Sequence, residues 1–77
     1  MSPKLPAASG KETIRALRRA GFFVARIKGS HHVLAHQDDP TRTVIVLVHA
    51  NRSLKPGTLS GIIKQAGLNL DEFLELL

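Results

Sequence analysis

The fold of this chain is decided by residues 22–49, which read FFVARIKGSHHVLAHQDDPTRTVIVLVH. The stretch contains three runs that are rich in residues favouring β-structure, at 22–28, 31–37 and 43–49. Between them, Gly29-Ser30 is typical of a tight hairpin turn, and Asp38–Thr41 combines Asx and proline turn chemistry. We therefore expect an antiparallel meander of three strands.

The third run is the strongest strand candidate, because it is apolar at every position from Val44 to Val48. A continuous apolar run is typical of a strand that is covered on both faces. One face would meet helices and the other a partner, which would also account for Phe23 and Ile27 on the first strand. The alternative is a central strand with a mildly apolar outer face, and the sequence leaves both interpretations open.

Helices are expected before and after this meander along the chain. Residues 1–8 carry two prolines and no periodicity, so they are expected to form an extended arm. Ser9 and Glu12 have the spacing of a capping box and predict a helix over residues 10–20. Its apolar stripe comprises Ile14, Leu17 and Ala20, and Gly21 supplies the left-handed conformation that ends it.

Two further helices follow the connector at residues 50–54. Pro56 suits the first turn of the second helix, which Gly67 ends. Its buried stripe comprises Leu59, Ile62, Ile63 and Ala66. Gly61, inside this helix, is expected to pack closely against the sheet, and Lys64 is expected to be solvated. A second capping box at residues 69–72 opens a short helix with Phe73, Leu74 and Leu77 facing inward. The fold class is therefore α+β, in the order α-β-β-β-α with a terminal helix.

Length, composition and net charge limit the classes of function that this chain can have. A chain of 77 residues predicts a single domain with a thin core, so a surface site acting on a polymer is easier to build than a deep pocket. The absence of cysteine excludes disulfides and thiolate zinc sites, and no segment has the length of a signal peptide core or a membrane span. We expect a soluble, cytoplasmic protein. The net charge of +5 favours a nucleic-acid partner.

The charges are unevenly placed along the chain. Six cations and one acid lie between residues 11 and 28, whereas the last seven residues contain three acids and no cation. We therefore expect one positive side and a negative C-terminal end.

Four histidines raise the question of a metal site. On a strand, His32 and His36 share a face but stand roughly 13 Å apart, too far for one ion, and His31 points to the opposite face. No metal site is expected. A serine nucleophile at Ser30 with His31 as its base is also disfavoured, because neighbours on a strand point to opposite faces.

The remaining chemistry is general acid–base catalysis on RNA. Cleavage with the 2′-hydroxyl as internal nucleophile requires a base, an acid and cations for the charge that develops on phosphorus. Histidine is the side chain whose unperturbed pKa allows proton transfer near neutral pH. His31 directly follows the turn, so it is the candidate base or acid. The candidate RNA-binding residues are Arg26, Lys28, Gly29, Ser30 and Lys55, the glycine and serine through their amides. His49, with Lys55, flanks the start of the second helix and is a candidate second proton donor or cation.

In these residues the chain resembles the HicA toxins, mRNA interferases of bacterial and archaeal toxin–antitoxin pairs. The resemblance rests on Lys4-Leu5-Pro6, Ser9–Glu12, Ala20-Gly21-Phe22, Gly29-Ser30-His31, the strand ending at His49, Leu54–Leu59, Gln65–Leu68 and Glu72–Leu74. It implies a fold similar to a double-stranded RNA-binding domain, with helices on one face of the sheet. Leu47 departs from the pattern, because proline is more common there.

The resemblance also implies what the residues do. The family's catalytic histidine directly follows Gly-Ser, which is His31 here, whereas His32 occupies a variable position. The implied activity is cleavage of mRNA without metal or other cofactor, which inhibits translation. The implied partner is a HicB antitoxin that covers the active face. An apolar outer sheet face around Phe23 and Ile27 would fit that partner. Two other functions stay open: a non-catalytic RNA-binding module on the same scaffold, and a protein-interaction domain that uses the apolar sheet face.

Overall fold

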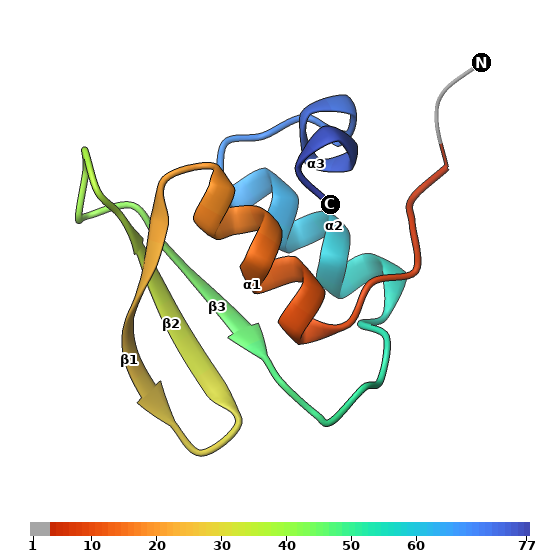
Figure 1. Cartoon of the computed structure of the whole chain (residues 1–77), viewed down its shortest axis with the longest axis horizontal. Coiled ribbons are helices and arrows are strands. Elements are labelled where there is room, and N and C mark those ends of the chain that lie inside the picture. Colours follow the sequence, from red (N-terminus) through yellow and green to blue (C-terminus); the bar gives the residue numbers. More distant parts are fainter. Residues whose placement is uncertain (1–3) are drawn as a thin grey trace.

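The computed structural model describes residues 4–77, so the first three residues of the expected arm lie outside it. The elements run α1 (Gly10–Arg19), β1 (Phe22–Lys28), β2 (His31–His36), β3 (Thr43–Leu47), α2 (Pro56–Gln65) and α3 (Leu70–Leu76). The strands form one antiparallel sheet in the order β1-β2-β3, and the helices lie on one side of it (Figure 1). The predicted α-β-β-β-α order and terminal helix are confirmed.

Local hydrogen bonds explain where α1 and α3 begin. The Ser9 hydroxyl accepts from the Glu12 amide at 3.1 Å, and the Glu12 carboxylate accepts from the Ser9 amide at 3.0 Å. This reciprocal pair is the predicted capping box, and it satisfies two amides that the helix leaves free. Asn69 and Glu72 repeat the arrangement at the start of α3. Gly21 ends α1 with a φ of +98°, a conformation that glycine adopts without strain.

The core consists of two adjoining clusters on the helix side of the sheet. The first joins the sheet to α1 and α2 and comprises Leu17, Phe22, Leu34, Val44, Val46, Ile62 and Ala66. The second lies among the helices and comprises Ala8, Ala16, Leu59, Ile63 and Phe73. Leu5 and Ala8 belong to this second cluster or pack against it, so the described part of the arm is attached to the domain. Leu77 is 42% exposed and does not face inward as expected, whereas Leu70 and Leu76 do pack on this cluster.

A β-bulge in β1 decides which side chains share a face. Val24 pairs with Leu34, but the next pair is Arg26 with Val33, so Ala25 is an extra residue. Phe22 and Val24 therefore lie on the helix side of the sheet, whereas Arg26 and Lys28 lie on the opposite side, which we call the outer face. Strict alternation from Phe22 would have placed these two cations on the helix side.

The bulge also corrects the expectation for the apolar side chains of β1. Phe23 pairs with the outward Ala35, but Ile27 pairs with His32 and so lies on the helix side. They do not form one patch, although both are exposed, at 45% and 59%.

The third strand lies at the edge of the sheet, because the strands are connected in sequence order, so the alternative of a central strand is wrong. Val44 and Val46 are buried on the helix side, whereas Ile45 is 53% exposed on the outer face. The outer face of this strand is therefore apolar, and its cover by a partner stays a prediction. Within α2, Gly61 makes no close contact with the sheet, since a Cβ added there would meet nothing within 4 Å.

Candidate functional site

The β1–β2 hairpin extends past the helices at one end of the molecule (Figure 1). His31 is the first residue of β2, and Lys28 is its partner across the hairpin. Directly opposed residues of an antiparallel pair have Cβ atoms about 4.5–5.5 Å apart and lie on the same face. With Arg26 also on the outer face, the hairpin presents one histidine and two cations together, all of them exposed.

The turn that carries this cluster is fixed by its backbone conformation and by one hydrogen bond to the rest of the domain. Gly29 has a φ of +59°, as the first residue of a two-residue type II′ hairpin loop requires, and a Cβ there would meet no neighbour. Glycine is therefore required here because it adopts a positive φ without strain, and not because a side chain would meet a neighbouring atom. The Ser30 carbonyl accepts a hydrogen bond from the Val48 amide at 2.8 Å, which attaches the turn to the chain leaving β3. This arrangement holds His31 in place without burying it.

The other strand histidines have different surroundings. His36 lies 4.9 Å from Phe22, ring centroid to ring centroid, in an edge-on arrangement. Its Nδ1 accepts from the Asp38 amide and its Nε2 lies 3.1 Å from the Ala20 carbonyl oxygen, so the ring carries its proton on Nε2. His36 is thus a structural residue that joins the end of α1 to the turn after β2.

His32 lies on the helix side, where its buried Nδ1 has no hydrogen-bond partner among residues 4–77. Within the same described range, no group of three or more His, Asp or Glu side chains is placed to hold a metal ion.

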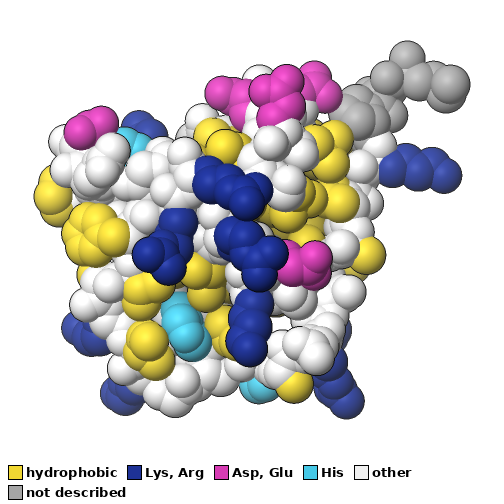
Figure 2. All heavy atoms as spheres, in the orientation of Figure 1, with side chains coloured by type: hydrophobic (Ala, Val, Ile, Leu, Met, Phe, Trp, Pro, Cys, Tyr) yellow, Lys and Arg dark blue, Asp and Glu magenta, His cyan; other side chains and the backbone are white. Residues whose placement is uncertain are grey.

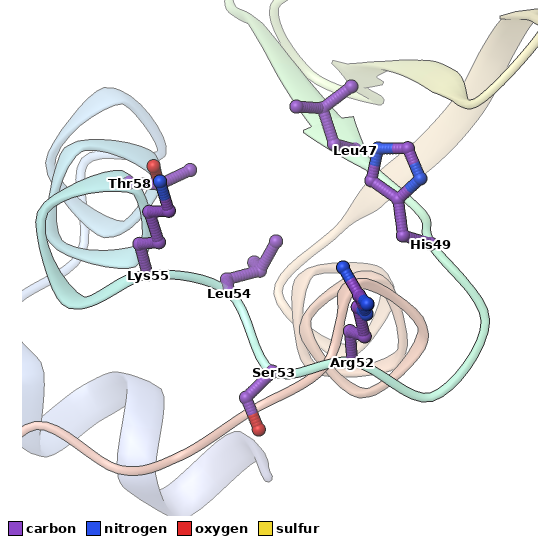
Figure 3. A pocket seen from close by; sticks show the side chains of 7 residues that line it. All are labelled: Leu47, His49, Arg52, Ser53, Leu54, Lys55 and Thr58. Carbon is purple, nitrogen blue, oxygen red and sulfur yellow. The ribbon is translucent and has the colours of Figure 1, made fainter.

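Lys55, the remaining predicted RNA-binding residue, lies away from the hairpin. It lines a surface cavity of about 320 Å³ between the end of β3 and the start of α2. The lining residues are Leu47, His49, Arg52, Ser53, Leu54, Lys55 and Thr58 (Figure 3). Leu47 is the partner of His31 across β2 and β3, so the cavity begins one strand away from the histidine. The predicted site therefore consists of two adjoining parts, the hairpin cluster and this cavity.

Of the exposed residues that line the cavity, His49 and Lys55 were candidates from the sequence, but Arg52 and Thr58 were not. Arg52 stands in a connector that has no periodicity, so nothing in the sequence indicates the direction of its side chain. Figure 3 shows the Arg52 side chain directed toward the opening and the Ser53 hydroxyl directed away from it.

The cations are distributed over two sides of the sheet. A band of Lys and Arg side chains crosses the face seen in Figure 2, over α1, and acidic side chains gather over α3. The exposed cations of α1 are Lys11, Arg15, Arg18 and Arg19. The acidic C-terminal end is as expected. The expected single positive side is not found, because the bulge places Arg26 and Lys28 on the outer face of the sheet, away from the cations of α1.

Comparison with known proteins identifies one family. A family model described as the HicA toxin of bacterial toxin–antitoxin systems matches residues 10–68, which span α1 to the end of the turn after α2. No curated protein matches the sequence. In the described part of the chain, no helix is both long and apolar enough to cross a membrane.

Proposed function

Because the chain belongs to the HicA toxin family of bacterial toxin–antitoxin systems, we propose that it acts as an endoribonuclease that cleaves mRNA and thereby inhibits translation. The observation that carries the proposal is the exposed hairpin cluster, in which Lys28 opposes His31 and Arg26 shares their face. In this proposal the whole chain is one catalytic domain that works in the cytoplasm, where mRNA is translated.

The proposed reaction uses the RNA's own 2′-hydroxyl as nucleophile. The 2′-oxygen loses its proton and attacks the adjacent phosphorus, and the bond from phosphorus to the 5′-oxygen breaks. The products are a 2′,3′-cyclic phosphate and a 5′-hydroxyl, which takes up a proton. His31 acts as general base or acid, a role typically worth 10²–10⁴-fold in rate.

Lys28 and Arg26 stabilise the extra negative charge that develops on the phosphoryl oxygens. The amides of Gly29 and Ser30 add hydrogen-bond donors at the turn, and Lys55 binds the RNA further along. No metal or other cofactor enters this scheme.

A HicB-like antitoxin that covers the outer face would block this site. Phe23 and Ile45 are exposed there, within the same sheet as His31, and provide an apolar area for such a partner. Ile27 does not contribute to this area, because it lies on the helix side.

The test is cleavage of a labelled mRNA in EDTA by the intact chain and by His31→Ala. His31 is exposed and makes no core contact, so its replacement is expected to leave the fold intact. We expect a loss of about a hundredfold or more with RNA binding retained. Equal cleavage by both proteins would remove His31 from the mechanism. Binding without cleavage by either protein would identify a non-catalytic RNA-binding module, and absence of binding at physiological salt would favour a protein-interaction domain.

A further inference from the structure

The cavity between β3 and α2 has a floor and a rim of different chemistry. Leu47 and Leu54 are half-buried and apolar, whereas His49, Arg52, Lys55 and Thr58 are exposed around them. None of the described residues that line it is acidic. We propose that this cavity binds the nucleotide next to the cleaved bond, with the base on the two leucines and the phosphate held by Arg52 and Lys55. This inference rests on the function proposed above and specifies how the substrate is held.

The size of the cavity suits one nucleotide. At about 320 Å³ it lies at the lower end of the range for small-ligand sites, roughly 300–1,000 Å³. Such sites combine an apolar lining with a few polar groups that fix orientation. A nucleotide has the same two parts, a flat apolar base and an anionic phosphate, whereas inorganic phosphate would leave the leucines uncovered.

The connector that carries the cations is held in place by backbone hydrogen bonds. The Arg52 amide donates to the His49 carbonyl at 3.0 Å, and the Leu54 amide donates to the Ala8 carbonyl at 2.8 Å. Ser9 and Ser53 also form an isolated β-bridge. The segment from His49 to Leu54 is therefore attached to the N-terminal arm, and less ordering entropy is lost when a ligand binds.

The position of the cavity relative to His31 supports a single RNA path over both. Leu47 opposes His31 on the outer face, and the Ser30 carbonyl accepts a hydrogen bond from the Val48 amide. A strand of RNA with its scissile phosphate at Lys28 and His31 would meet the cavity at the next strand of the sheet. Arg52 binds substrate in this scheme and takes no part in proton transfer.

The kinetic test compares Arg52→Ala with Lys64→Ala, which removes an exposed cation of α2 that does not line the cavity. We expect Arg52→Ala to raise KM for mRNA roughly tenfold or more, since it removes one charge-assisted contact to phosphate, while kcat stays within about twofold. Arg52→Lys should restore most of the affinity, and Lys64→Ala should behave as the intact protein. In the His31→Ala background, Arg52→Ala should lower the slope of log affinity against log salt by about 0.7, as expected for one lost contact to a single strand.

A direct test uses small probes and does not depend on cleavage. The His31→Ala protein is titrated with adenosine 5′-monophosphate, adenosine or inorganic phosphate while backbone amide resonances are followed by NMR. We expect the nucleotide to shift the amides of Leu47, Arg52 and Thr58, and each of the two fragments to shift them less at equal concentration.

The outcomes separate the two proposals. If the intact protein cleaves RNA but Arg52→Ala and Lys64→Ala give the same KM, the cavity proposal is wrong and the ribonuclease proposal stands. If nothing is cleaved, yet the nucleotide shifts the cavity amides, the catalytic proposal fails and the nucleotide site stands. Shifts confined to the hairpin would overturn the cavity site, as would phosphate shifting the cavity amides as strongly as the nucleotide.

Discussion

Two glycines with opposite surroundings give a sharp test of the packing. Gly10, the first residue of α1, is buried against the end of β3, where an added Cβ would overlap the Leu47 carbonyl oxygen and lie 3.1 Å from the Val48 Cα. These are backbone atoms, so Gly10→Ala can be accommodated only if α1 moves away from the sheet. Overpacking of this kind typically costs about 1–3 kcal/mol. Gly61 is exposed inside α2, and a Cβ there meets nothing within 4 Å.

Gly61→Ala should therefore stabilise the protein by about 0.8–1 kcal/mol, the difference in helix propensity between glycine and alanine. In a domain of this size 1 kcal/mol shifts Tm by roughly 4–8 °C. We thus expect Gly10→Ala to lower Tm by about 10 °C and Gly61→Ala to raise it by about 5 °C. Circular dichroism melts of both variants measure these shifts, and the His31→Ala background, which the proposed function predicts to be inactive, is used for all of them.

Either result alone can refute the reasoning. If Gly10→Ala melts within about 2 °C of its parent, the close approach of α1 to β3 does not exist in solution. If Gly61→Ala is destabilised, that glycine has a packing role against the sheet after all, as the sequence had suggested.

Two further predictions concern a histidine and a carboxylate. His32→Leu removes a buried nitrogen that lacks a hydrogen-bond partner among the described residues, so it should raise the free energy of unfolding by about 1 kcal/mol, as a thermal melt will show. It should leave mRNA cleavage in the EDTA assay unchanged. A lower Tm would mean that His32 has a hydrogen-bond partner in solution. Hydrogen bonds from the Ser9 amide and hydroxyl hold the pKa of Glu12 below its usual value of 4.5, so ionised Glu12 stabilises the fold above that pH and this contribution is lost as pH falls through the lowered pKa. Glu12→Gln should therefore lose less Tm than its parent between about pH 7 and about pH 3, and an equal loss would contradict the capping role.

The order of helices and strands could be predicted because residues that are close in sequence determine where each element begins and ends. The two capping boxes, Gly21 after α1 and Gly29 in the hairpin each meet a backbone requirement, and the structure contains each of these features. The edge position of β3 could also have been predicted, since the third strand of a three-stranded meander always lies at an edge of the sheet. The apolar run from Val44 to Val48 nevertheless allowed a central strand as an alternative, because the residue type alone does not tell whether Ile45 is exposed or buried.

Other features could not be predicted, because they depend on contacts far apart in the chain. No residue type marks the bulge at Ala25; it follows from fitting seven residues of β1 to six of β2. The absence of packing around Gly61 depends on how α2 approaches the sheet. The cavity depends on the attachment of residues 52–54 to the N-terminal arm, so nothing in the sequence indicated that Arg52 lines it.

The bulge has a consequence for insertions and deletions in this chain. Ala25 is one residue more than pairing requires, so a chain without it would keep Val24 opposite Leu34 and Lys28 opposite His31. The loss of one residue at this position is therefore neutral for the pairing around His31. Loss of one residue between Arg26 and Lys28 would transfer a cation to the helix side of the sheet, away from His31. Length variation within β1 is thus expected to be confined to the bulge.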